Sequence, residues 1–247
     1  MPRQDAGPIG PGDTRTDVAP HGFSPQELWP LPVGMARHKL GLPEQQFIVL
    51  QLGRIVPGKG IDAGIRALTL LRSRHAIDAQ LLIVGGGPPE LPDTAELVRL
   101  RALADELGMG AHVRIWGRTS RQQLRYFYGA ADVFVTLPQY PPFGSTAVEA
   151  MACARPVIGV DAGHLRDIVV DGTTGFLVPP ADPEALCRRL LVLQDNPPVA
   201  RSMGEQGMHR AYQRYTWRSI AGRMATLSAK SAPASGPVSR MQGSEWL

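Results

Sequence analysis

Short apolar runs alternate with amphipathic segments along most of this chain. The runs are rich in β-branched residues and predict buried strands at residues 46–52, 79–84, 112–116, 132–136, 156–160 and 175–178. The segments between them place apolar residues at helical spacing and predict helices at 61–74, 97–107, 119–128, 146–153, 163–169 and from 183 to about 227. Such strands alternating with helices are typical of a parallel sheet covered on both faces. We therefore predict an α/β fold, a doubly wound, Rossmann-like parallel sheet with further C-terminal helices.

Helix-start and loop signals divide the chain into one domain and two flanking segments. Ser24-Pro25-Gln26-Glu27 has the pattern of a capping box with proline in the first turn, which predicts a short helix. Asp182-Pro183-Glu184 predicts the start of a longer helix. Residues 1–20 are rich in Gly, Pro and Asp without a period and are expected to be a disordered lead-in, while 228–247 are expected to form a flexible tail. The predicted domain is thus 21–227.

Composition agrees with a packed domain and narrows the classes of partner. The chain of 247 residues is 43% hydrophobic and 19% charged, and its net charge is +4. It contains no long basic run and no interleaving of basic and aromatic residues, so nucleic acid is not expected as a partner. The positive charge suits an anionic small ligand, and it suits a membrane-surface acceptor equally well.

Two sequence features indicate the cellular compartment. No apolar run reaches membrane-spanning length, and the N-terminus lacks a signal-peptide pattern. Cys153 and Cys187 lie in apolar helical segments without neighbouring metal ligands, so we expect two buried free thiols in a reducing environment. These features predict a cytoplasmic protein, with the inner face of the membrane as a candidate peripheral docking surface.

A loop between the predicted strand 132–136 and the next helix indicates an anion site. Gly144, Ser145 and Thr146 open that helix, where free backbone N–H groups and the helix dipole favour a negative charge. Glu149 follows just over one turn later among small apolar residues, and a buried carboxylate needs a partner. A ribose diol is the favoured partner, and a salt bridge to Arg or Lys is the alternative. A phosphate beside a hydroxyl-rich group predicts a nucleotide or a nucleotide sugar.

The loop after the first predicted strand, residues 53–60, carries two cations. Gly53 lets the backbone approach a ligand closely, and Arg54 and Lys59 can converge on one anion. The loop lacks the Gly-Lys-Ser/Thr ending of a Walker motif, and a turn with two solvated cations is the alternative. Because the carboxyl ends of parallel strands lie at the same edge of a sheet, we expect Arg54 and Lys59 to lie near the 142–146 loop.

Three further segments give weaker signals at the same edge. Backbone groups near Ile115 are candidates for contacting a base and Arg118 for holding it, while solvated arginines at a strand end are the alternative. Gly85-Gly86-Gly87 lacks the third glycine of the dinucleotide fingerprint, so it predicts a tight turn. His164 is expected to be structural. The sequence predicts neither a metal cluster nor a Ser-His-Asp arrangement.

Taken together and in this order, the motifs resemble the C-terminal, nucleotide-sugar-binding half of retaining glycosyltransferases of family four, which have the GT-B fold. The resemblance covers residues 18–227. The matching pieces are Gly53-Arg54-Ile55-Val56-Pro57, Lys59-Gly60, Leu82-Ile83-Val84-Gly85, Gly87-Pro88, Val113, Ile115, Gly117, Pro142-Phe143-Gly144, Glu149-Ala150-Met151-Ala152, Pro156-Val157-Ile158, Asp171-Gly172, Gly175-Phe176-Leu177-Val178 and Asp182-Pro183-Glu184-Ala185-Leu186.

The resemblance implies a function for each part of the site. Arg54 and Lys59 would be the catalytic pair that neutralises the donor diphosphate. The helix that opens with Gly144, Ser145 and Thr146 would cradle the phosphates, with Phe143 as a further substrate-binding residue, and Glu149 would bind the ribose. The implied reaction transfers a sugar from a nucleoside diphosphate sugar to a hydroxyl acceptor with retention. It requires neither a metal nor a cofactor besides the donor substrate.

Three departures from the family pattern leave an alternative open. Pro141 stands eight positions before Glu149, where the family has a second glutamate, and His164 replaces the second glycine of a Gly-Gly pair. About 45 residues precede the first strand, too few for the family's acceptor-binding domain, so we expect that part on a separate domain or chain. The alternative is a non-catalytic or truncated module that binds a sugar nucleotide. A nucleotide-sugar epimerase of related fold would need acid–base residues that the sequence does not place.

Overall fold

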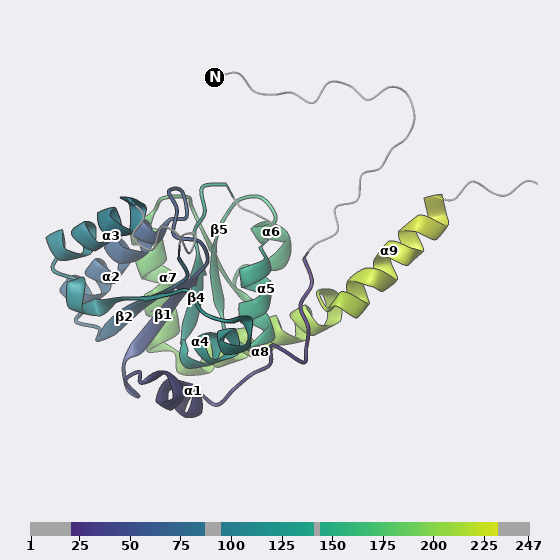
Figure 1. Ribbon diagram of the computed structural model, residues 1–247, viewed down its shortest axis with the longest axis horizontal. Coiled ribbons are helices and arrows are strands. Elements are labelled where there is room, and N and C mark those ends of the chain that lie inside the picture. The colour runs from purple at the N-terminus through teal and green to yellow at the C-terminus, as the bar shows by residue number, and fades with distance from the viewer. Residues whose placement is uncertain (1–20, 87–94, 141–143, 232–247) are drawn as a thin grey trace, which may run out of the picture.

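The computed structural model describes residues 21–86, 95–140 and 144–231, and it contains a six-stranded parallel sheet. The strand order is β3-β2-β1-β4-β5-β6, so the chain winds outward from β1 in one direction and then returns to the other side (Figure 1). The strands are β1 Phe47–Leu52, β2 Ala79–Val84, β3 Val113–Gly117, β4 Val133–Thr136, β5 Val157–Val160 and β6 Gly175–Val178. This order confirms the predicted doubly wound α/β sheet and puts its topological switch between β1 and β4, where open sheets of this kind bind ligands.

Helices cover both faces of the sheet and form two separate cores. The helices are α1 Val33–Leu40, α2 Ile61–His75, α3 Ala95–Glu106, α4 Leu124–Ala130, α5 Ser145–Ala152, α6 Leu165–Ile168, α7 Pro183–Asp195, α8 Pro197–Arg214 and α9 Trp217–Ser231. Neighbouring strand residues point to opposite faces. Ile48 and Leu50 of β1 therefore pack with α1, α4 and α5, while Val49 packs with α2, α3 and α7.

The predicted short helix at Ser24 is wrong. Residues 25–27 form a turn, and α1 begins only at Val33, after Pro32. The Ser24 hydroxyl donates to the Gln26 side chain at 2.8 Å. The Phe23 N–H donates to the Tyr215 carbonyl at 2.9 Å, and this pairing with the C-terminal region holds the segment extended. Pro30 and Pro32 each lack an N–H, so they block a helix that would continue from Ser24.

The last helix, α9, extends away from the body of the domain (Figure 1). It continues to Ser231, beyond the predicted end near residue 227, and it carries exposed apolar side chains at Met224 and Leu227. The predicted lead-in at 1–20 and most of the predicted tail, 232–247, lie outside the described residues. Within the described ranges, none of the helices is long and apolar enough to cross a membrane.

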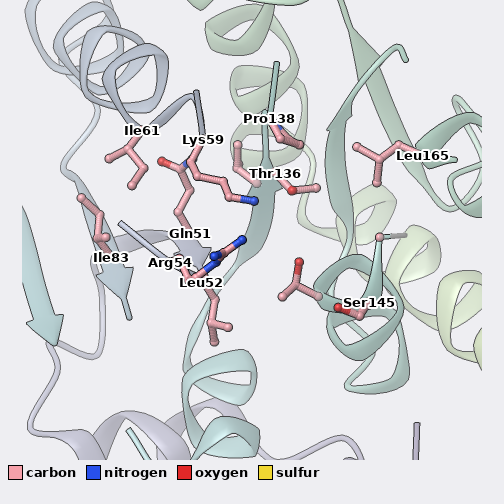
Figure 2. A pocket seen from close by; sticks show the side chains of 14 residues that line it. Gln51, Leu52, Arg54, Lys59, Ile61, Ile83, Thr136, Pro138, Ser145 and Leu165 are labelled. Carbon is pink, nitrogen blue, oxygen red and sulfur yellow. The ribbon is translucent and has the colours of Figure 1, made fainter. Parts of the chain in front are cut away.

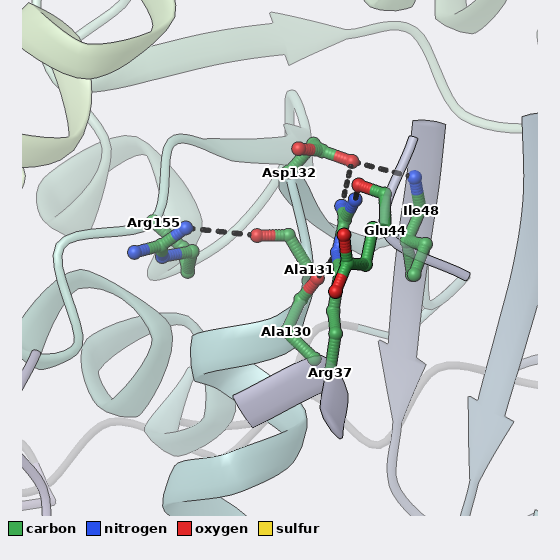
Figure 3. A network of polar contacts seen from close by, with 7 residues as sticks. All are labelled: Arg37, Glu44, Ile48, Ala130, Ala131, Asp132 and Arg155. Atoms are coloured by element: carbon green, nitrogen blue, oxygen red, sulfur yellow. Dashed lines mark hydrogen bonds and ion pairs between the residues drawn. The ribbon is translucent and has the colours of Figure 1, made fainter. Parts of the chain in front are cut away.

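A partly buried ion pair joins α1 to the start of β4 (Figure 3). Arg37 is 3% exposed, and its Nη2 lies 2.7 Å from Oδ2 of Asp132. Arg37 Nε donates to the Ala130 carbonyl at 3.0 Å, and Asp132 Oδ2 also accepts from the Ile48 N–H at 2.7 Å. Burial raises the pKa of the Asp132 carboxyl, and the positive charge of Arg37 opposes that shift. The pair therefore locks α1 against the edge of the sheet opposite the ligand edge.

Replacing Arg37 by alanine is expected to lower the free energy of unfolding by about 2 kcal/mol, because it leaves the Asp132 carboxylate without its cation and a buried carbonyl without its donor. Urea denaturation, monitored by circular dichroism, measures this change in the free energy of unfolding. Arg74→Ala is the matched control, because Arg74 and Glu184 form an exposed pair, with side chains 61% and 49% exposed. It should change the same free energy by no more than about 0.5 kcal/mol. Equal losses in the two variants would contradict a special role for the Arg37–Asp132 pair.

Candidate functional site

A pocket of about 150 Å³ lies at the carboxyl ends of β1 and β4 (Figure 2). Most of its lining comes from the end of β1 with the loop that follows it, the end of β4 and the first turn of α5, and Ile61, Ile83 and Leu165 complete it. The lining includes six of the predicted site residues, namely Gly53, Arg54, Lys59, Gly144, Ser145 and Thr146. The structure thus brings the 53–60 loop and the start of α5 together, although three strands and three α-helices lie between them in the sequence.

Arg54 and Lys59 supply the positive charge of this pocket. Figure 2 shows their nitrogen ends pointing into the same part of the pocket, opposite Ser145. Burial and the neighbouring Arg54 charge both lower the pKa of the Lys59 ammonium. Within the described part of the chain, no carboxylate forms an ion pair with either cation. A bound anion would offset the repulsion between them, so the pair is suited to a group with more than one negative charge, such as a diphosphate.

The first turn of α5 faces the two cations across the pocket. Gly144 is its N-cap with a φ of 71°, and no side chain caps the helix. The left-handed backbone angle favours glycine, and a Cβ at Gly144 would lie 2.3 Å from Cδ1 of Ile168, so that side chain would have to shift. The uncapped N–H groups and the positive end of the helix dipole favour an anion at this point. The pocket therefore offers cations on one wall and backbone donors on the other.

Glu149 lies one turn deeper in α5 and does not line the pocket. It is 6% exposed, and its Oε2 accepts a hydrogen bond from the Tyr128 hydroxyl at 2.8 Å. Its Oε1 lies 3.8 Å from Nη1 of Arg121. Burial raises the pKa of the Glu149 carboxyl, while the Tyr128 hydrogen bond and the Arg121 charge lower it. The predicted alternative, a salt bridge to an arginine, is therefore present only as the 3.8 Å contact with Arg121. The residue that forms a hydrogen bond with Glu149 is Tyr128.

The remaining predicted residues lie outside the pocket. Ile115 is half-buried in β3, two strands from β1, and Arg118 is exposed just beyond the end of β3. Neither of them lines the pocket. Nearby, Arg114 lies 4.7 Å above the Trp116 ring and donates to the Gly41 carbonyl, so it has structural contacts. Phe143 and Pro141 lie outside the described residues.

Sequence reasoning missed several residues of the site. Gln51, Thr136, Pro138 and Leu165 line the pocket. Gln51 is 5% exposed, and its Oε1 has no hydrogen-bond partner among the described residues. A glutamine inside an otherwise apolar parallel strand was the available signal for it. Tyr128 had no such signal, because its relation to Glu149 depends on α4 and α5 packing on the same face of the sheet.

His164 lies beside the pocket, next to Leu165 at the start of α6. Its Nδ1 is 3.8 Å from Oδ2 of Asp167, which agrees with a structural role. Cys153 and Cys187 are buried free thiols, as predicted, and burial raises the pKa of Cys153 to about 12. Among the residues that the structure describes, no group of three or more His, Cys, Asp or Glu side chains is placed to hold a metal ion.

Comparison with known proteins identifies the family. A model of glycosyl transferases group 1 matches residues 35–210. D-inositol 3-phosphate glycosyltransferase of Thermobispora bispora is 32% identical over 212 residues, which is 85% of this chain and 49% of that protein. A GDP-mannose-dependent alpha-(1-6)-phosphatidylinositol monomannoside mannosyltransferase of Mycolicibacterium smegmatis is 34% identical, over 84% of this chain and 54% of that protein.

A solved structure has a similar fold. Sucrose-phosphate synthase from Thermosynechococcus elongatus superposes with a TM-score of 0.78 and 35% identity, covering 87% of this chain and 52% of that one. This chain therefore spans about half the length of the relatives that it matches. The matched region contains both loops of the pocket, which confirms the resemblance found from the motifs. The chain belongs to the family of glycosyl transferases group 1.

Proposed function

We propose that this domain binds the donor of a glycosyltransferase and that the donor is a nucleoside diphosphate sugar. The observation that carries the proposal is the pairing of Arg54 and Lys59 with the uncapped N-terminus of α5 around one pocket. The similarity to an enzyme whose name specifies GDP-mannose supports a sugar nucleotide as the ligand. Arg54, Lys59 and the first turn of α5 would hold the diphosphate. Glu149 would bind the ribose, and the strand end near Ile115 and Arg118 would contact the base.

The proposed reaction transfers the sugar to a hydroxyl acceptor with retention of configuration. The bond between the anomeric carbon and the diphosphate oxygen breaks, and its electron pair stays on the departing diphosphate. The acceptor oxygen then bonds to the anomeric carbon, and its proton is released to the diphosphate. Negative charge grows on the diphosphate as the first bond lengthens, so Arg54, Lys59 and the α5 N–H groups would stabilise the transition state more than the bound donor. We propose that this stabilisation requires no metal or additional cofactor.

We further propose that transfer requires a second, acceptor-binding domain, either on a longer polypeptide or on a separate chain. The support is that the chain matches about half of each relative. By itself, the domain would then act as a sugar-nucleotide-binding module. The buried free thiols support a reducing compartment such as the cytoplasm, and the net charge of +4 is compatible with work at a membrane surface.

Isothermal titration calorimetry with UDP, GDP, ADP, their monophosphates and pyrophosphate tests donor binding. At least one nucleoside diphosphate should bind more tightly than its monophosphate, because the second phosphate reaches the cation pair. The failure of every diphosphate to bind would overturn the proposal. A release assay with the corresponding radiolabelled sugar nucleotide tests turnover. Efficient transfer to acceptors by this chain alone would contradict the need for a second domain.

A further inference from the structure

We propose that Tyr128 is a positioning residue of the nucleotide site. Its hydroxyl holds one oxygen of Glu149, so the other carboxylate oxygen is presented to the hydroxyl groups of a ribose. The inference rests on the proposed function, because it takes Glu149 as the ribose ligand. It adds a second residue, on a different helix, that would control how strongly Glu149 binds the ribose.

The position of the Tyr128 hydroxyl is fixed by packing. Its side chain is 0% exposed in the core between the sheet and α4, and its ring meets the Phe134 ring edge-on with centroids 5.7 Å apart. Burial and the negative charge of Glu149 raise the pKa of the Tyr128 phenol well above its ordinary value. The phenol therefore stays protonated and acts as a donor. A donor held this rigidly sets the rotation of the Glu149 carboxylate.

The two oxygens of Glu149 have different surroundings. Oε2 accepts from Tyr128 at 2.8 Å, while the nearest cation to Oε1, Arg121 Nη1, is 3.8 Å away and beyond hydrogen-bond range. Arg121 instead donates through Nε to Oε2 of Glu27 at 2.7 Å. Among the described residues, no hydrogen bond reaches Oε1. One oxygen is thus occupied, while the other has no hydrogen bond from the described residues, and its two lone pairs can accept from the hydroxyl groups of a ribose.

The same contact controls the charge of Glu149. Burial raises the pKa of this carboxyl, and the hydrogen bond from Tyr128 is the largest influence that lowers it. Removing the hydroxyl should therefore raise the pKa of Glu149 further and leave the carboxylate protonated to a higher pH. The titratable groups that act on Glu149 are Tyr128 of α4, Arg121, the N-terminal residues His21 and Glu27, and Cys153 at the end of α5.

The test compares the wild-type protein with Tyr128→Phe by calorimetry, using three probes: the best-bound ribonucleoside diphosphate, its 2′,3′-dideoxy counterpart and inorganic pyrophosphate. The variant should bind the ribonucleotide about tenfold more weakly and leave the other two within about twofold. The pH at which ribonucleotide affinity reaches half its maximum should also rise in the variant. Tyr126→Phe is the matched control on the same helix, because its hydroxyl contacts Arg125 at 3.3 Å, and all affinities should stay unchanged.

A double-mutant comparison and the comparison among the three probes separate the possible explanations. In a Glu149→Gln background, Tyr128→Phe should cause little additional loss, because the two residues act on one contact. An equal loss for all three probes, or an unchanged ribonucleotide affinity, would overturn the role of Tyr128 while leaving the proposed function intact. Wild-type protein that binds pyrophosphate, the dideoxy and the ribose nucleotide equally would overturn the role of Glu149. Wild-type protein that binds none of them would overturn the proposed function and this inference together.

Discussion

Replacing Arg54 and Lys59 together by alanine is expected to weaken the binding of a nucleoside diphosphate about 1,000-fold. Each cation would make charge-assisted hydrogen bonds to the diphosphate, and such bonds contribute about 2 kcal/mol each, which together correspond to roughly three powers of ten in the dissociation constant. Their convergence on one pocket is the reason to expect both to contribute. Calorimetry with the wild-type protein and the variant measures the ratio directly.

A control for net charge accompanies this variant. The double variant Arg66→Ala, Arg74→Ala also removes two positive charges, both of them exposed on α2 and away from the pocket lining. It should weaken diphosphate binding by less than about threefold at physiological salt, where distant surface charges are screened. Similar losses in the two double variants would mean that general charge attracts the ligand, and the assigned pocket would then be wrong.

The second large effect is expected from Gly85→Ala, which should lower the free energy of unfolding by about 4 kcal/mol or prevent folding. Gly85 follows β2 with a φ of 141°, and a Cβ there would lie 1.7 Å from the carbonyl oxygen of Gly53. Relieving that overlap would move the loop that begins at Gly53 and carries Arg54. Gly85, in the predicted tight turn, therefore sets the distance between the loop that follows β1 and the loop that follows β2.

Urea denaturation measures this loss, and Gly34→Ala is the control. Gly34 lies inside α1, and nothing lies within 4 Å of the position that its Cβ would take. This substitution should leave stability unchanged or raise it by up to about 1 kcal/mol, because alanine favours the helix. A Gly85→Ala protein as stable as the wild type would show that the loop adapts without cost and would contradict this explanation.

Much of the fold could be predicted because its signals are local. Apolar strands and helical spacing give the parallel sheet, and the Asp182 cap is present as predicted, with its carboxylate accepting from the Ala185 N–H at 2.8 Å. The helix predicted at Ser24 failed because a non-local contact, the pairing of Phe23 with Tyr215, overrides a local capping pattern. The helix α1, Val33–Leu40, was not predicted, although Pro32 before it and Gly41 after it were local signals for its ends.

Some residues of the candidate site could also be predicted from the sequence, and others could not. Arg54, Lys59 and the α5 N-terminus were predictable, because their loops follow strands whose carboxyl ends must share an edge. Tyr128 was not, because the contact joins residues 21 positions apart through the packing of two helices. Gln51 fills space beside Gly64, where an added Cβ would lie 2.4 Å from its Oε1. Its position in an otherwise apolar strand was a signal in the sequence, and the structure adds that it lines the pocket.

A crystal structure of the protein with its preferred nucleoside diphosphate sugar tests the central claim most directly. The account predicts the diphosphate between the side chains of Arg54 and Lys59 and the backbone N–H groups of Ser145 and Thr146, with the ribose within hydrogen-bond distance of Glu149. A nucleotide bound elsewhere, or this pocket left empty at a saturating concentration of the ligand, would contradict it.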